Sequence, residues 1–233
     1  MIKKALNDLK SGKPVLIFDN PEREGETDIV FASQFVDHEK VQFMRSFGGG
    51  LICTTLPERY ASKIGLPFIE DVYRNYLKLN PRAFDNSDLR YDKNTSFSVT
   101  INDRRTFTGI PDNDRALTIT SFAGFLSNLN QYNGSAGDVF SEIFRVPGHV
   151  ILIIARNGYF SQRRGHTELS TYLMEKANLI PSATIVEMLD TDGYSLRRNK
   201  AETFAKEHNL TFIEGDTIIA QWKDDQSNGN GGI

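Results

Sequence analysis

The sequence predicts a layered α/β domain with a mixed β-sheet, and two observations carry this prediction. Short apolar runs of strand length alternate along the chain with segments of helical periodicity, an order typical of helices packed on a sheet. The longest apolar runs, such as 150–155, have the length of a strand and are too short to cross a membrane. Because the 233 residues contain no internal repeat and no glycine-rich nucleotide motif, we interpret them as one domain.

The first half of the chain begins with a helix and continues into buried strands. An amphipathic pattern over residues 3–10 predicts a short helix that ends at Ser11-Gly12. Asp37 is a suitable N-cap for a helix that runs to Phe47 and ends at the three glycines 48–50. The apolar runs of this half predict strands at 14–19, 29–32 and 51–55.

The second half begins with a polar surface connection at 80–95 and returns to alternating elements. Ser121 is a candidate cap for a helix through Leu129, and Thr167 opens a helix through Ala177. The remaining predicted elements are strands at 96–101, 150–155, 184–187 and 212–213, a turn at 190–193 and a helix at 198–208. The Ser-, Asn- and Gly-rich residues 226–233 predict a disordered tail after a domain at 1–225.

Composition limits the class of protein. The chain has 27 Lys and Arg against 30 Asp and Glu, so its net charge of −3 argues against a general nucleic-acid binder. Its one cysteine, Cys53, forms neither an intramolecular disulfide nor a cysteine-rich zinc site. The N-terminus also lacks the apolar core of a signal peptide. We therefore expect a cytoplasmic protein that binds neither nucleic acid nor a membrane.

Acidic side chains recur at every second position from Glu22 to Asp28, with Glu24 and Glu26 between them. If this stretch is extended, the four carboxylates point to one side. Like charges this close raise each other's pKa unless a divalent cation or Arg23 lies among them. A solvated loop is the alternative. The position between two buried strands favours a site, because ligands of α/β proteins bind at strand ends.

A second polar segment, Arg163-Arg164-Gly165-His166-Thr167-Glu168, precedes and opens a predicted helix. Helix N-termini attract anions through their free N–H groups, and arginine adds donors suited to phosphate. His166 is suited to metal binding or proton transfer, and Thr167 to capping or phosphate binding. The segment therefore suits a phosphorylated, metal-bound ligand. The alternative is an ordinary capped helix with two surface arginines.

His149 follows a Pro-Gly pair that predicts a turn before the strand at 150–155. That strand separates His149 from 163–167 by roughly 20 Å, so sharing one site requires the loop to fold back or a second subunit to contribute. Otherwise His149 is a structural histidine of the turn. Glu187 lies in the apolar run 183–189, either buried and suited to acid–base work or on an exposed strand face.

Together these motifs resemble the 3,4-dihydroxy-2-butanone 4-phosphate synthase family. The resemblance covers residues 3–218 and is nearest in style to stand-alone archaeal members. It rests on the order and spacing of the segments 23–28, 49–53, 106–110 with Asp114-Arg115, 145–149, 163–168 and Glu187. It implies a single three-layer α/β (α+β) domain with a mixed twisted sheet flanked by helices.

The resemblance also implies residue roles. Glu24 and His166 match the metal ligands, and the residues matching catalytic positions are His149, Glu187 and Cys53. The residues matching substrate contacts are Arg23, Glu24, Asp28, Thr108, Arg163, Arg164, Gly165, His166, Thr167 and Glu187, with the phosphate at Arg163 and Thr167. Asp19 and Glu26 match active-site positions without an assigned role. Cys53 is alternatively a small buried residue of its strand.

The implied reaction is a lyase step of riboflavin biosynthesis. D-Ribulose 5-phosphate becomes L-3,4-dihydroxy-2-butanone 4-phosphate and formate, with Mg²⁺ or Mn²⁺, in a homodimer whose site lies near the interface. Some relatives carry a fused GTP cyclohydrolase II domain with a three-cysteine zinc site, so the single cysteine predicts one activity only. The alternatives are another metal-dependent aldolase or isomerase for sugar phosphates, and a binding module that keeps the fold without the chemistry.

Overall fold

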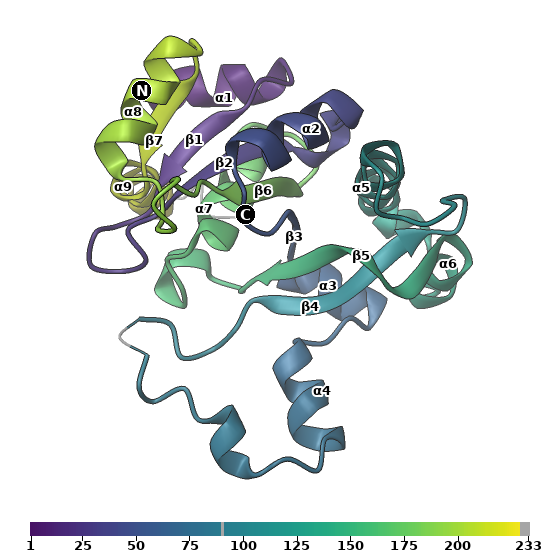
Figure 1. Ribbon diagram of the computed structural model, residues 1–233. Coiled ribbons are helices and arrows are strands. Elements are labelled where there is room, and N and C mark those ends of the chain that lie inside the picture. The colour runs from purple at the N-terminus through teal and green to yellow at the C-terminus, as the bar shows by residue number, and fades with distance from the viewer. Residues whose placement is uncertain (90, 229–233) are drawn as a thin grey trace.

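A seven-stranded mixed sheet lies at the centre of the computed structural model, which describes residues 1–89 and 91–228 (Figure 1). The strand order is β4-β5-β3-β6-β2-β1-β7, with β1 parallel to β7, β3 parallel to β5 and the other pairs antiparallel. The strands are β1 Val15–Phe18, β2 Thr27–Ala32, β3 Cys53–Pro57, β4 Phe97–Asp103, β5 Phe144–Ala155, β6 Ala183–Glu187 and β7 Thr211–Glu214. The predicted mixed α/β sheet is confirmed.

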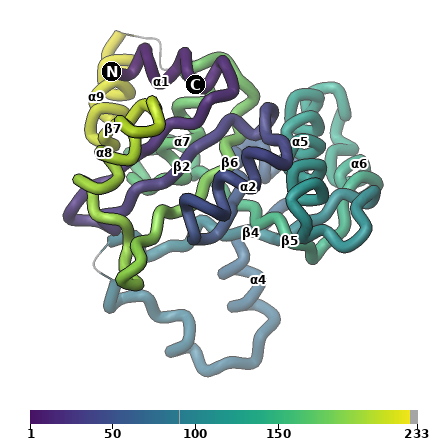
Figure 2. Tube along the Cα trace, turned by 45° about the horizontal axis from the view of Figure 1, so that its top comes forward, coloured from purple at the N-terminus to yellow at the C-terminus, as the bar shows by residue number. Residues whose placement is uncertain are grey.

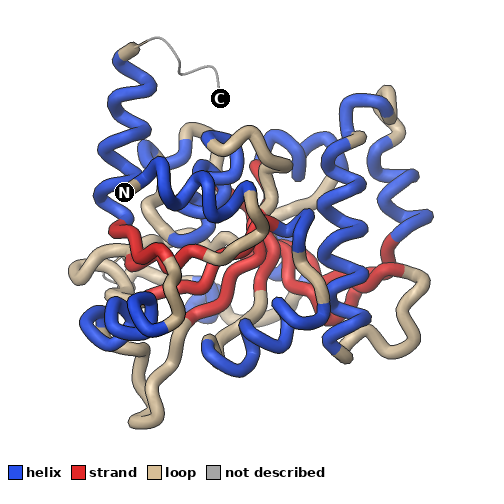
Figure 3. The backbone as a smooth tube through the Cα atoms, turned by 90° about the horizontal axis from the view of Figure 1, so that it is seen from above, coloured by secondary structure: helices blue, strands red, loops and turns tan. Residues whose placement is uncertain are grey.

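Helices cover both faces of the sheet and make it the middle of three layers (Figure 3). One face packs against α1 Ile2–Lys10, α7 His166–Lys176 and α9 Gly215–Ser227. The other face packs against α2 His38–Phe47, α3 Glu58–Ile64, α5 Asp112–Ser127, α6 Ala136–Ile143 and α8 Arg198–Glu207. The strands β1, β2 and β3 are buried along their whole length, and β1 and the 29–32 part of β2 appear in the sequence as continuous apolar runs.

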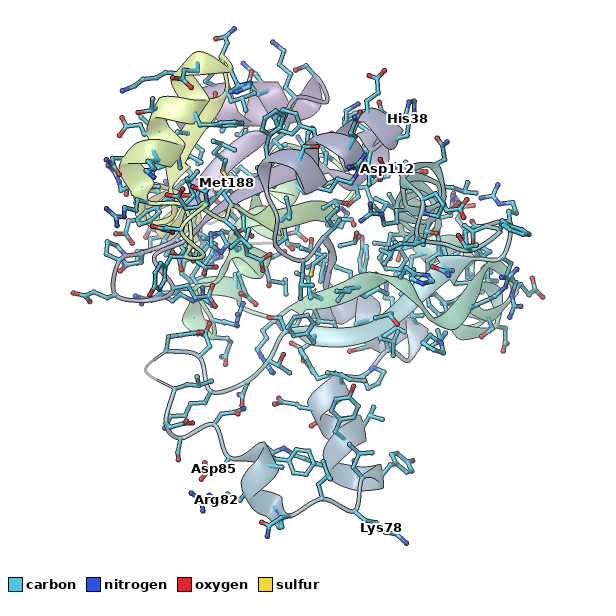
Figure 4. All side chains as sticks on the ribbon, viewed as in Figure 1. His38, Lys78, Arg82, Asp85, Asp112 and Met188 are labelled. Carbon is cyan, nitrogen blue, oxygen red and sulfur yellow. The ribbon has the colours of Figure 1, made fainter. Side chains whose placement is uncertain are left out.

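An excursion between α3 and β4 projects from the body of the domain (Figures 1 and 2). It contains α4 Ile69–Tyr76, which has no buried residue, and a 3₁₀ turn at Pro81–Phe84. The charged side chains of Lys78, Arg82 and Asp85 lie at its far end (Figure 4). The excursion returns to the sheet through 85–96, a stretch in which the described residues form no helix or strand. This return matters for the site described below.

Short 3₁₀ turns join several of the elements. Besides the one in the excursion, they lie at Ser33–Phe35, Leu129–Gln131 and Tyr159–Ser161. None of the helices formed by residues 1–89 and 91–228 is long and apolar enough to cross a membrane.

Four details of the sequence prediction are wrong. The helix expected to begin at Ser121 begins at Asp112, because Pro111 and two first-turn aspartates favour an earlier start. The turn expected at Pro147-Gly148 is extended backbone inside β5. Gly165, not Thr167, is the N-cap of α7. The expected tail begins inside α9, which includes 226–227, and 229–233 lie outside the described residues.

Candidate active site

The face of the sheet under α7 carries a row of polar side chains from three strands. Asp28 of β2 pairs with Glu187 of β6, and Cys53 of β3 pairs with Ile185, two residues before Glu187. Because side chains alternate along a strand, Asp28, Glu187 and Cys53 all point to this face. They line a cavity of about 370 Å³ together with Glu24, Arg163, His166 and Thr167. Small-molecule sites are commonly of this size.

His166, at the start of α7, faces two carboxylates. Its Nε2 lies 3.1 Å from the carbonyl oxygen of Ile17 and donates to it, which leaves Nδ1 on the cavity side. Nδ1 lies 3.5 Å from Asp28 Oδ1 and 3.8 Å from Glu24 Oε2. A histidine whose second nitrogen is fixed by a backbone carbonyl is the usual arrangement of a metal ligand.

Burial and charge shift the protonation of this cluster. Burial raises the pKa of Asp28 to about 8, and the charges of Glu187, Glu24 and Glu26 add to the rise. Burial alone would lower the pKa of His166, but Asp28, Glu24 and Asp19 together raise it to about 9. Burial likewise opposes ionisation of Glu24, yet His166 and Arg23 hold its pKa at about 2. The metal-free cluster therefore retains protons that a divalent cation would replace.

The donor set suits a divalent cation of the Mg²⁺ or Mn²⁺ kind. Asp28 Oδ1 is buried without a hydrogen-bond partner among the described residues, so the cluster contains an unused oxygen beside His166. Two ligand atoms on one such ion are at most about 4.2 Å apart, which the separation of Glu24 from His166 satisfies. A single histidine among carboxylates is acceptable to Mn²⁺ and tolerable for Mg²⁺.

Asp19 lies close enough to be a third ligand, since ligand atoms of Asp19, Glu24 and His166 lie within 4.8 Å of one another. Its two carboxylate oxygens are already engaged. Oδ1 accepts the N–H of Glu26 at 3.0 Å, and Oδ2 accepts the N–H of Glu24 at 3.2 Å and Arg23 Nη1 at 3.0 Å. We therefore assign Asp19 to holding the acidic turn in shape.

The acidic segment is extended only from Thr27 onward, so the condition that would align its four carboxylates on one side is not met. Its first part, 21–24, is a turn, and Gly25 completes it with a φ of 67°, a conformation that favours glycine. Glu22 is exposed to solvent, whereas Glu24, Glu26 and Asp28 converge on the site. Arg23 lies among the carboxylates, as the spacing suggested, with Nη1 bonded to Asp19 and Glu24.

The N-terminus of α7 brings two guanidinium groups together. A Cβ on Gly165 would lie 2.2 Å from Arg163 Nη1 and 2.7 Å from Arg23 Nη2, so a larger residue at this position would have to displace both guanidinium groups. Arg163 also donates to Thr167 at 3.3 Å and to Glu168 at 2.9 Å. Arg164, predicted to contact substrate, is exposed and lines a neighbouring hollow with Asp216 instead of the main cavity.

Glu187 is held at the cavity by the glycine-rich segment. Its Oε2 accepts the backbone N–H of Leu51 at 2.8 Å. A Cβ on Gly50 would lie 2.2 Å from the same oxygen, so the backbone approaches the carboxylate only because residue 50 is glycine. Glu187 is half-buried, so it lies between the buried and the exposed alternatives, with its carboxylate held at the cavity wall.

Cys53 forms part of the cavity wall. Burial raises the pKa of its thiol, and the charges of Glu187 and Asp28 raise it further. The group is therefore a neutral thiol at neutral pH, unsuited to act as a nucleophile. This supports the view of Cys53 as a small buried side chain that also touches the ligand space.

Two predicted residues, His149 and Thr108, lie together but outside the residues that line the cavity. His149 is exposed on β5, and the side-chain amide of Asn102 orients it. The backbone N–H of His149 donates to Asn102 Oδ1 at 2.8 Å, and Asn102 Nδ2 lies 3.1 Å from His149 Nδ1. The same amide lies 3.5 Å from the carbonyl oxygen of Thr108. Large apolar side chains are exposed in this region, namely Phe107 (95%), Ile110 (52%) and Val146 (53%).

Several residues that line the cavity come from the connection at 86–97 and escaped the sequence analysis, and Asp92 is the one that pairs with the arginines. Asp92 lies in the connection expected to run over the surface. Its carboxylate forms ion pairs with Arg23 and with Arg163. Nothing in its polar neighbourhood distinguishes it from Asp85 or Asp88, because its position depends on how the excursion folds back.

A sequence model described as 3,4-dihydroxy-2-butanone 4-phosphate synthase matches residues 3–221. The chain belongs to this family. The 3,4-dihydroxy-2-butanone 4-phosphate synthase of Methanothermobacter thermautotrophicus is 39% identical over 97% of this chain and 98% of its own length. The enzyme of that name from Archaeoglobus fulgidus is 41% identical over 95% of this chain and 93% of its own.

A solved 3,4-dihydroxy-2-butanone 4-phosphate synthase in complex with two magnesium ions has the same fold. It superposes with a TM-score of 0.74 at 27% identity and covers 98% of both chains. The 3,4-dihydroxy-2-butanone 4-phosphate synthase family converts ribulose 5-phosphate to 3,4-dihydroxy-2-butanone 4-phosphate in riboflavin biosynthesis, and this chain is an enzyme of that family.

Proposed function

We propose that this chain releases formate as it converts D-ribulose 5-phosphate to L-3,4-dihydroxy-2-butanone 4-phosphate, with Mg²⁺ or Mn²⁺ bound. The observation that carries the proposal is the position of His166 Nδ1. It faces Glu24 and Asp28 inside a cavity that the anion-binding start of α7 also reaches. Metal ligands and phosphate donors therefore converge within one substrate-sized space.

Glu24 and His166 would hold the cation. A bound divalent cation supplies stabilisation of the negative charge that develops on sugar oxygens during enolisation. Arg163, Thr167 and the free N–H groups of the first turn of α7 bind the phosphate. Arg23 and Asp28 contact the sugar, and the engaged position of Arg23 keeps the acidic turn closed over it.

Proton transfers in the reaction require more than one acid–base group. Glu187 lies at the cavity wall beside Asp28, fixed by the Leu51 N–H, which places a carboxylate where a substrate C–H or O–H would lie. Cys53 closes the same wall as a neutral thiol. These side chains bind, orient and move protons without a covalent intermediate on the protein.

His149 acts in the site of a second subunit. It is exposed, held in one orientation by Asn102 and outside its own chain's cavity lining. The exposed apolar side chains of Phe107, Ile110 and Val146 surround this region, a pattern typical of an interface between subunits. A homodimer that buries them would carry His149 and Thr108 toward the partner's cavity. The cytoplasmic location stays a prediction.

The direct test is incubation of the purified protein with D-ribulose 5-phosphate and Mg²⁺ or Mn²⁺, followed by assay of formate. We expect formate to accumulate only when the cation is present and to match the butanone phosphate formed. A pentose phosphate product without formate would instead support an isomerase or aldolase. Metal binding without any turnover would support a binding module.

A further inference from the structure

We infer that Asp92 is an internal counter-ion that occupies the phosphate subsite until the phosphate group of a substrate displaces it. The inference deepens the proposed function, because it rests on Arg163 as a phosphate ligand. It assigns a role in phosphate binding to a residue that the roles described above do not use.

The carboxylate of Asp92 bridges the two guanidinium groups. Its Oδ2 accepts Nε of Arg23 at 3.1 Å and also bonds Nη2 of Arg23. The same oxygen lies 2.9 Å from Nε of Arg163. Tyr91, the preceding residue, places its ring 5.2 Å from the guanidinium carbon of Arg23. The carboxylate of Asp92 therefore lies between the guanidinium groups of Arg23 and Arg163.

Asp92 leaves one nitrogen of the Arg163 guanidinium group without a hydrogen bond among the described residues. Although Asp92 Oδ2 is 2.9 Å away, Nε of Arg163 is a buried nitrogen that makes no hydrogen bond with the described residues. Their contact is therefore an ion pair with poor hydrogen-bond alignment. A phosphate group presents several oxygens and can align with the guanidinium group of Arg163, so it is the better acceptor.

Charge repulsion favours the departure of one carboxylate when phosphate arrives. Arg23 contacts Asp19, Glu24 and Asp92, and Arg163 contacts Glu168 and Asp92. Two guanidinium groups thus already face four carboxylates. A phosphate dianion added beside all four would meet strong repulsion in this partly buried site.

Among these four carboxylates, Asp92 is the one able to leave. The side chains of Asp19 and Glu168 have no exposed surface, and backbone N–H groups hold both. Glu24 belongs to the metal cluster. Asp92 has 19% of its side chain exposed and lies in the return of the excursion, where the described residues form no helix or strand.

The exchange concerns the phosphate group alone. A phosphorylated sugar supplies a replacement anion when Asp92 withdraws. A free sugar supplies none, so Asp92 stays in place, because its departure would leave two partly buried guanidinium groups without their bridging partner. Asp92 therefore competes with the phosphorylated ligand and leaves the affinity for the free sugar unchanged.

The test measures binding of inorganic phosphate to the Mg²⁺-loaded protein by calorimetry. Asp92→Asn keeps the shape of the side chain and removes its charge, so phosphate should bind ~10-fold more tightly, a magnitude typical of lost competition from partly buried charge-assisted contacts. Asp88→Asn is the matched control, because Asp88 is an exposed aspartate of the same connection. It should bind phosphate like the unmodified protein.

The second measurement is the ratio of kcat/KM for D-ribulose 5-phosphate to that for D-ribulose, which Asp92→Asn should raise, because only the phosphorylated sugar competes with Asp92. Phosphate affinity that is unchanged or weaker in Asp92→Asn, or absent from both proteins, overturns the inference even if formate is produced. Tighter phosphate binding in a protein that never releases formate would uphold the counter-ion and contradict the proposed reaction.

Discussion

Asp28 Oδ1 lies 3.5 Å from His166 Nδ1, and both side chains are buried on the face of the sheet that α7 covers. A carboxyl group and an imidazole at this distance share protons that neither would hold alone, since burial penalises the carboxylate and the carboxylates favour the imidazolium. The pair thus links the proton content of the site to metal binding.

The first prediction is that metal affinity rises with pH. With the pKa of His166 raised to about 9 and that of Asp28 to about 8, the metal-free site is protonated at pH 7. Metal binding must expel these protons, so the apparent Kd should fall by ~10-fold per pH unit for each proton released. Calorimetric titration with Mn²⁺ at pH 6.5 and 8.5, in buffers of different ionisation enthalpy, measures both effects. Equal affinity at the two pH values would contradict this linkage.

The second prediction separates metal ligands from the residue that supports them. Glu24→Gln and His166→Asn should each weaken Mn²⁺ binding by at least ~100-fold and abolish turnover, because outer partners alone account for ~10–100-fold. Asp19→Asn should cost less, since it perturbs the turn but removes no assigned ligand. Full activity in either ligand variant, or a larger loss in Asp19→Asn, would reverse the assignment.

The sequence could predict the sheet and the chemistry of the site because both depend on local patterns. The strand β1 and the 29–32 part of β2 are apolar runs, and Asp37 caps α2 as its residue type suggests. Glu24, His166 and Arg163 follow or precede such elements within a few residues. Their meeting at one cavity follows from the strand and helix that carry them.

What the sequence could not give depends on long-range packing. The role of Asp92 requires the excursion to return across the acidic turn, and no local pattern encodes that path. The Pro147-Gly148 pair suggested a turn, yet pairing with β4 keeps it extended, and a Cβ on Gly148 would lie 2.0 Å from the Ile101 backbone. The location of Arg164 outside the cavity is likewise a matter of how the chain turns before α7.

The third prediction concerns the glycine behind Glu187. Gly50→Ala places a methyl group 2.2 Å from the present position of Glu187 Oε2, so the carboxylate must move. We expect kcat to fall by ~10²-fold, within the range that a displaced acid–base group costs, while KM changes little. Steady-state kinetics with D-ribulose 5-phosphate measure the split. Gly124→Ala is the control, because a Cβ there meets nothing within 4 Å. A harmless Gly50→Ala would show that the approach of the backbone is not required.

The fourth prediction tests Glu187 directly. Glu187→Gln keeps the acceptor oxygen for the Leu51 N–H and the volume of the side chain, but it cannot accept a proton. Binding of D-ribulose 5-phosphate, measured by calorimetry, should stay within a few-fold, whereas kcat should fall by ~10²–10⁴-fold. An unchanged kcat would remove Glu187 from proton transfer and leave it a structural role.

The fifth prediction is complementation between subunits. His149→Ala and Glu187→Gln homodimers should each be nearly inactive, for different reasons. If His149 serves the partner's cavity, a heterodimer of the two contains one complete site, so an equal mixture after subunit exchange should regain about a quarter of the unmodified activity. Fluorescent labels on the two variants would show whether exchange has occurred. A mixture that exchanges fully and stays inactive would place His149 in its own subunit's site.

The same face can be tested for assembly with Phe107→Asp, because the ring of Phe107 is 95% exposed in the single chain. Loss of the dimer in this variant, measured by sedimentation, would show that the face takes part in the subunit interface.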